Sequence, residues 1–108
     1  MSGSRIENVH GGHGAVHVHN LMHDQALEPF SAALWCELEP GASVGRHTQQ
    51  RDPELVICVS GEGQVEVDGQ SAPFVRGVTV LLPFGSTLAL TNPSSERLVY
   101  LIIKATTA

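Results

Sequence analysis

The sequence contains little cysteine and little positive charge, and each shortage excludes a class of protein. Two cysteines, Cys36 and Cys58, lie in strand-like segments and do not form a disulfide framework, so we expect buried, reduced thiols of a cytoplasmic protein. Six lysine and arginine residues stand against 11 aspartate and glutamate residues, which gives a net charge of −5. The basic residues are scattered and form no basic patch, so nucleic acid is not an expected partner.

Long apolar runs are missing as well. No run approaches the ~20 residues that a membrane-spanning helix needs. The first ten residues, MSGSRIENVH, contain no apolar segment of the kind that a signal peptide carries. We therefore expect no membrane partner and a cytoplasmic location.

The sequence does contain a series of short segments with the pattern of β-strands. Its 108 residues fit one domain, and 42% of them are hydrophobic, as in a globular fold. Apolar and polar residues alternate at 15–21 and 30–38, which indicates strands with one buried face. The segments 55–59 and 78–82 are apolar throughout, which indicates strands covered on both faces. The pattern predicts an all-β fold of roughly eight to ten strands.

Periodicity alone leaves three all-β folds open: an up-and-down barrel, an immunoglobulin-like sandwich and a jelly roll. Residues 1–14 show no comparable alternation and end in the glycine-rich segment HGGHG. Glycines in such a cluster favour a loop, so we expect residues 1–14 to be a loop-like N-terminal arm.

Two stretches bounded by glycines resemble the motifs of the cupin family. Residues 41–61 follow the cupin pattern G-x5-H-x-H-x3-4-E-x6-G, and residues 77–92 follow the spacing of G-x5-P-x-G-x2-H-x3-N. The intervening SGEGQVEVDG is similar to the family's hairpin, and GGHGAVHV is similar to its leading strand. The chain thus resembles a small single-domain cupin over residues 1–108. The resemblance implies a double-stranded β-helix, or jelly-roll barrel, with a pocket inside.

The chain departs from the family at two of the positions that bind metal. Metal-binding cupins use two histidines and the glutamate of the first motif and the histidine of the second. This sequence keeps His47 and Glu54, but it has Gln49 and Leu88 at the other two positions. An amide is a weak ligand for a transition metal, and leucine is no ligand. The resemblance implies a partly degenerate site, in which His47, Gln49 and Glu54 are the candidate ligands for a divalent Fe, Mn, Ni or Zn ion.

The expected pocket residues are His47, Gln49, Glu54, Cys58 and Leu88. Two interpretations of His47 and Glu54 stay open: a buried pair that hydrogen-bonds to each other, and an acid–base pair that acts on a ligand. Cys58 shares the parity of Glu54 along its strand, so it points toward the pocket side of a regular strand. For its thiol we favour plain core packing over a reactive role.

Three functions follow from the resemblance. The first hypothesis is a barrel that binds a small molecule and retains a partly degenerate metal site. The second is a metal-dependent cupin enzyme of the dioxygenase, isomerase or lyase type that uses His47, Gln49 and Glu54. The third is a sensory domain that responds to a small effector. Cupins of this size pair through their sheets, so the resemblance also implies a homodimer.

Five of the six histidines lie between residues 10 and 23. His17 and His19 are expected on one strand face, where the pair could chelate Zn²⁺ or Ni²⁺. We favour a solvent-facing strand edge or a dimer contact, because two histidines supply only half of the usual ligand set. The other interpretation is that one of these five histidines reaches into the barrel and replaces a lost ligand.

Overall fold

The structure is a computed structural model, and it describes residues 3–49 and 51–106. Within these ranges the chain forms strands β1 (Ser4–Glu7), β2 (Ala15–Asn20), β3 (Phe30–Leu38), β4 (Ser43–Thr48), β5 (Glu54–Ser60), β6 (Glu62–Val67), β7 (Gln70–Val75), β8 (Thr79–Leu82), β9 (Thr87–Thr91) and β10 (Leu98–Ala105), and a short 3-10 helix η1 (Val9–Gly11). No helix in the described part of the chain is long and apolar enough to cross a membrane.

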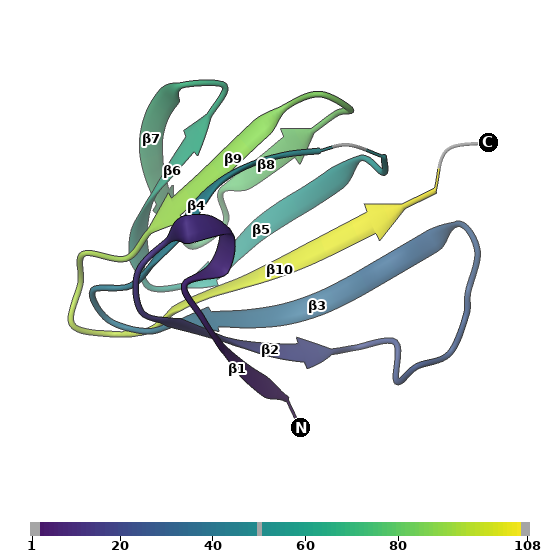
Figure 1. Cartoon of the computed structure of the whole chain (residues 1–108), viewed down its shortest axis with the longest axis horizontal. Coiled ribbons are helices and arrows are strands. Elements are labelled where there is room, and N and C mark those ends of the chain that lie inside the picture. Colours follow the sequence, from purple (N-terminus) through teal and green to yellow (C-terminus); the bar gives the residue numbers. More distant parts are fainter. Residues whose placement is uncertain (1–2, 50, 107–108) are drawn as a thin grey trace.

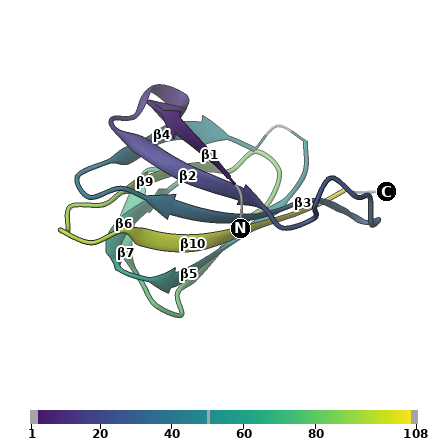
Figure 2. The same ribbon diagram turned by 90° about the horizontal axis from the view of Figure 1, so that it is seen from below.

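The strands form two antiparallel sheets, which confirms the predicted all-β barrel. The larger sheet has the order β1-β2-β3-β10-β5-β8, and the smaller sheet has the order β4-β9-β6-β7 (Figure 1). Viewed from below, β3 and β10 lie in front of the strands of the smaller sheet (Figure 2). Because neighbouring strands such as β3 and β10 are far apart in the sequence, the sheets bring distant residues together.

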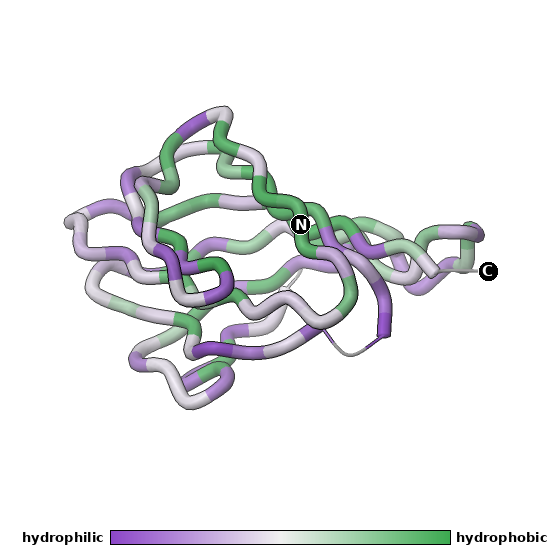
Figure 3. Tube along the Cα trace, turned by 90° about the horizontal axis from the view of Figure 1, so that it is seen from above, coloured by the Kyte–Doolittle hydropathy of each residue, from purple (hydrophilic) through white to green (hydrophobic). Residues whose placement is uncertain are grey.

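The core lies between the two sheets and takes every second residue of their strands. Buried and half-buried residues alternate along β5, β9 and the first part of β10, as the period of a strand requires. The trace coloured by hydropathy accordingly changes from green to purple in short steps (Figure 3). Phe74 and Tyr100 come from different sheets, and their rings meet edge to face with centroids 6.2 Å apart. The sheets therefore close on one shared apolar core.

The prediction that β5 and β8 are covered on both faces is wrong. The inward residues of β5 and Leu82 of β8 are buried and Val80 is half-buried, but Leu81 is 69% exposed and Leu55 is half-buried. Leu55 pairs with Leu81 and with Ile103 across the larger sheet, and these three side chains line an open apolar groove of about 540 Å³. The apolar run reflects one core face and one exposed apolar face of the same strands.

The prediction that residues 1–14 form a loop-like arm is wrong for residues 4–7. They form β1, which pairs with β2 and places Arg5 opposite His17. All four residues are exposed, so β1 is held by backbone pairing and ion pairs and shows no apolar alternation in the sequence. Arg5 bonds Glu39 through its Nε atom at 3.0 Å, and Arg5, then His17, lower the pKa of Glu39 to about 2.

Both cysteines are free and buried, as the sequence analysis expected. Burial raises the pKa of the Cys36 thiol to about 12 from its ordinary 9.0, and burial also raises the pKa of Cys58. Since the folded-state pKa of Cys36 is the higher one, the stability that it contributes is complete below pH 9.0 and is lost as pH rises toward 12.

We therefore expect neither thiol to react with a colorimetric thiol reagent in the folded protein at pH 8, because the thiolate is the reactive form. Both thiols should react once urea unfolds the chain. Reaction of either thiol in the folded protein within seconds would contradict the buried, protonated state. The thiol titration with and without urea measures both outcomes.

Candidate functional site

A cavity of about 600 Å³ lies at the end of the barrel where β4 ends and β5 begins. The residues that line it are His10, Arg46, His47, Thr48, Gln49, Arg51, Asp52 and Lys104. They come from the short helix η1, from β4 and the segment after it, and from the C-terminal end of strand β10. Three segments that are distant in the sequence therefore build one site.

His47 lies on β4 directly opposite Leu88 of β9. Its ring stacks on the ring of His10, with centroids 4.2 Å apart and planes inclined by 19°. Burial, and then the neighbouring His10, lower the pKa of His47. Its Nδ1 atom is buried and has no hydrogen-bond partner among the described residues. The cavity wall thus holds a neutral imidazole with an unused ring nitrogen.

Gln49 and Glu54 are buried polar residues at this end of the barrel, and they contact each other. The Gln49 amide donates to Oε2 of Glu54, and it lies 3.5 Å from Nε2 of His47. A carboxylate only accepts hydrogen bonds, so the nitrogen of the amide faces Glu54. Burial raises the pKa of Glu54, while the charge of Lys104 and the Gln49 amide oppose that shift.

The expectation that His47 and Glu54 hydrogen-bond to each other is wrong, because Gln49 stands between them. The register of β4 against β9 shifts between Val44 and His47. Beyond the shift, the backbone of Gln49 bonds to Ser86 at 2.9 Å and to Gly85 at 2.8 Å. These bonds fix the backbone at the end of β4, where the Gln49 side chain turns inward and occupies the space that links His47 to Glu54.

Lys104 reaches the same carboxylate from the other side. It lies on β10 directly opposite Glu54 of β5, and its Nζ atom is 3.7 Å from Oε2 of Glu54. The Glu54 side chain is 1% exposed, whereas the Lys104 side chain is 37% exposed. The carboxylate is therefore buried behind an ammonium group that still faces the cavity.

A model of the cupin domain matches residues 34–104. The chain belongs to the cupin family. An oxalate-binding protein of Thermotoga maritima is 29% identical over 101 residues, which are 92% of this chain and 83% of that protein. The crystal structure of a predicted oxalate decarboxylase from Thermotoga maritima is similar with a TM-score of 0.88 at 25% identity, covering 99% of this chain and 94% of that one. A cupin 2 conserved barrel domain protein from Salinispora arenicola is similar with a TM-score of 0.74 at 29% identity, covering 85% and 76%.

Of the five expected pocket residues, only His47 and Gln49 line the cavity. Glu54 is buried behind Lys104, and the other two lie in the core of this cupin. Cys58 and Leu88 are each 2% exposed. Cys58 lies four residues along β5 from Glu54, which is roughly 13 Å at the rise of a strand. Its sulfur lies 3.8 Å from the carbonyl oxygen of Phe74, so it packs at the closed part of the barrel. The alternation of side chains along β5 correctly predicted that Cys58 faces the barrel interior. The distance along the strand from Glu54 to Cys58 keeps it out of the cavity.

The motif spacing does not name His10 or the cationic residues Arg46, Arg51 and Lys104 of the cavity lining. His10 is the histidine among them. It sits in η1, which packs on β4 through two glycines: a Cβ on Gly45 would lie 2.0 Å from the His10 carbonyl oxygen, and one on Gly12 would lie 2.2 Å from that of Ser43. The backbone of His10 has a φ of 51°, in the left-handed region. The signal in the sequence was the glycine-rich segment HGGHG, which permits this close approach.

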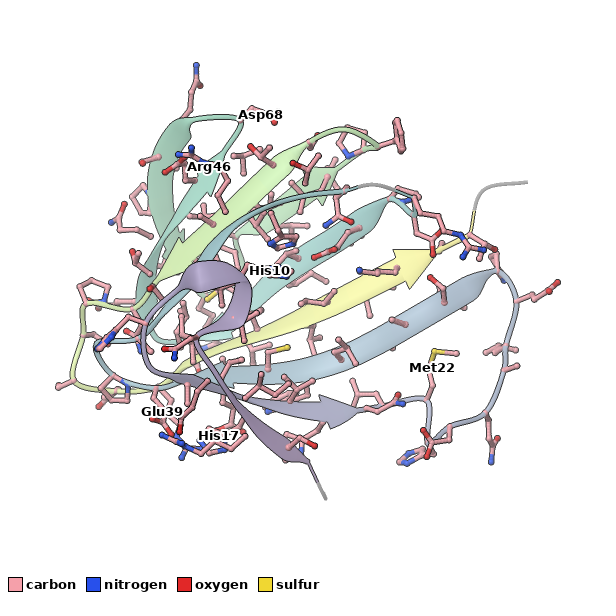
Figure 4. All side chains as sticks on the ribbon, viewed as in Figure 1. His10, His17, Met22, Glu39, Arg46 and Asp68 are labelled. Carbon is pink, nitrogen blue, oxygen red and sulfur yellow. The ribbon has the colours of Figure 1, made fainter. Side chains whose placement is uncertain are left out.

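His17 is on the outer face of the larger sheet. Its Nε2 atom lies 2.7 Å from Oε2 of Glu39 and 3.4 Å from the Arg97 guanidinium. Figure 4 shows His17 beside Glu39 and away from His10. Of the N-terminal histidines, His10 rather than His17 is therefore the one at the barrel cavity.

The residues present in this cupin do not fit the divalent metal that its family often binds. Leu88 offers no donor atom, the amide nitrogen of Gln49 is directed at Glu54, and the ammonium of Lys104 lies against the carboxylate. The rings of His10 and His47 are stacked, so their in-plane lone pairs do not converge on one point. Among residues 3–49 and 51–106, no group of three or more His, Cys, Asp or Glu residues could hold a metal ion. Structural zinc sites, by comparison, use four ligands.

Proposed function

We propose that this cupin binds a small carboxylate anion in the cavity that is lined by η1, β4, the segment after β4, and β10. The observation that carries the proposal is the charge of the cavity lining. Arg46, Arg51 and Lys104 are three of the six lysine and arginine residues of a chain whose net charge is −5. Asp52 is the only acid among the described lining residues. Clustered charge of one sign in a concave site attracts ligands of the opposite sign.

The chemistry of the lining fits a carboxylate group. Guanidinium and ammonium groups donate charge-assisted hydrogen bonds to carboxylate oxygens. The Arg51 side chain is 88% exposed at the rim of the cavity. Its Nε atom lies 3.8 Å from Oδ1 of Asp52, which is longer than a hydrogen bond, so the guanidinium remains accessible to a ligand. The Thermotoga maritima relative named as an oxalate-binding protein supports the same class of ligand. Gln49 and Leu88 at two ligand positions give the metal-dependent enzyme hypothesis no further support.

The remaining expectations stay predictions: a homodimer in the cytoplasm, without a nucleic-acid or membrane partner. The apolar groove on the outer face of the larger sheet supports the homodimer, because exposed apolar surface of this kind is often covered by a second chain. The acidic balance of the sequence supports the absence of nucleic acid.

Calorimetric titration of oxalate into tag-free protein tests the proposed function. We expect a dissociation constant of about 10 µM to 1 mM, which weakens as salt screens the cavity charges. Oxamide, the neutral diamide of the same shape, should not bind. Arg51→Gln should weaken the binding of oxalate by about three- to tenfold, as expected for the loss of an exposed charge. Arg76→Gln removes an exposed arginine that does not line the cavity, and it should leave the dissociation constant of oxalate unchanged. Absence of heat with oxalate, formate and acetate alike would contradict the proposal.

A further inference from the structure

We infer that Lys104 takes the place of the metal ion in this cupin, so that its ammonium group, backed by Glu54, holds the carboxylate ligand directly. The inference rests on the proposed function and deepens it: it assigns the cation that binds the anion. The ligand class is a small carboxylate that is bound without a metal.

The position of Lys104 follows from its strand. β10 places Leu98 and Tyr100 in the core, and Lys104 continues the same parity, so its side chain leaves the strand toward the barrel interior. The pairing of β10 with β5 sets it opposite Glu54. Its aliphatic stem lies against the barrel wall while its charged end faces the cavity, which is the usual arrangement for a half-exposed lysine.

The carboxylate of Glu54 already has a cation. Its Oε2 atom accepts from Gln49 and lies 3.7 Å from Nζ of Lys104. A divalent ion at this carboxylate would have to displace the ammonium or lie next to it, and two cations that close repel each other. With Leu88 and Gln49 in the family's ligand positions, the ion would gain only His47 and Glu54 in return. The ammonium therefore holds the position at lower cost than a metal.

An ammonium group can do what a bound cation does for an anionic ligand. It has three N–H donors and no acceptor, so it can contact Glu54 and still present donors to the cavity. Lys104 lines that cavity together with His47 and Gln49. Arg46 and Arg51 are less suited, because Arg46 pairs with Glu66 and Arg51 is 88% exposed. Lys104 is the cation of the site that is both fixed by a buried partner and open to a ligand.

The test uses the whole chain, freed of metal by chelation and dialysis, with its metal content checked by mass spectrometry. Oxalate is titrated calorimetrically into the stripped protein, and again after incubation with Mn²⁺ or Ni²⁺ and removal of the unbound metal, which would itself chelate oxalate. We expect the same dissociation constant within twofold in both cases. Lys104→Met keeps the length of the side chain and removes its charge, and it should weaken oxalate by about 10- to 100-fold, the value of a charge-assisted hydrogen bond. Lys104→Arg should keep the affinity within about tenfold, and the matched control Arg76→Met should leave it unchanged.

The possible results separate the two proposals. Binding that appears only after metal is added, or an unchanged affinity in Lys104→Met, overturns the role of Lys104 and leaves carboxylate binding standing. No binding of oxalate with or without metal overturns both. Lys104→Met leaves Glu54 without its cation, and the variant could fail to fold for that reason. In that event the double variant Lys104→Met/Glu54→Gln, which has neither charge, is titrated instead, and oxalate affinity equal to that of the parent overturns the inference.

Discussion

Replacing Asn92 by alanine is expected to destabilise this cupin by about 3–5 kcal/mol, because one buried and two part-buried carbonyl groups lose their donor. Asn92 is 1% exposed, and its amide donates to the carbonyl oxygens of Leu38, Glu39 and Glu96 at 3.0, 3.2 and 2.7 Å. These bonds tie the end of β9 to the end of β3 and to the segment before β10. In this chain, the last residue of the second cupin motif therefore stabilises the fold by hydrogen bonds to the backbone of two other segments.

Urea unfolding followed by the fluorescence of Trp35, the single tryptophan, measures the loss. The urea concentration at the midpoint should fall. The slope of the unfolding free energy against urea concentration should not change, since unfolding exposes the same amount of surface. Asn20→Ala is the matched control: Asn20 is exposed, its amide nitrogen donates to Asp24 at 3.3 Å, and its amide oxygen accepts from the backbone N–H of Met22 at 2.9 Å. Loss of these exposed bonds should cost about 1 kcal/mol or less. An equal, small effect of both changes would show that water replaces the Asn92 amide.

Gly45→Ala is expected to lower both stability, by about 1–3 kcal/mol, and oxalate affinity, by about threefold or more. The added Cβ would lie 2.0 Å from the carbonyl oxygen of His10 and 2.8 Å from its carbonyl carbon. Both are backbone atoms, so helix η1 must move away from β4. His10 would then leave His47, and the cavity would lose one wall.

Two controls separate the causes. Gly69→Ala adds a Cβ at a positive φ of 83° with nothing within 4 Å, so it should cost stability without changing oxalate affinity. His10→Ala should reproduce the loss of affinity with little loss of stability, because the ring is at the surface of the cavity. Chemical unfolding and calorimetry measure the two quantities on the same samples. If Gly45→Ala binds oxalate with the affinity of the parent, η1 is not part of the binding site.

Family and fold were predictable from the sequence because they depend on local patterns. Alternation at 30–38 predicted β3 at its observed bounds, and the glycine and proline spacing of the two motifs identified the barrel. The exposed strand β1 was missed, because a strand held by backbone pairing and ion pairs leaves no apolar period to detect. The apolar faces of β5 and β8 were misassigned, because an exposed apolar face and a buried one have the same composition.

The sequence by itself determined that His47, Gln49 and Glu54 are near one another, since they follow within one motif and its short loop. Only the tertiary structure decided what surrounds them. The pairing of β5 with β10 brings Lys104 to Glu54, 50 positions earlier in the sequence, and the packing of η1 on β4 brings His10 to His47. The first contact depends on strand register, which no local pattern encodes. The second depends on the space left by Gly12 and Gly45, for which the glycine-rich segment HGGHG was the only sign in the sequence. The charge at the centre of the site is therefore set by long-range pairing.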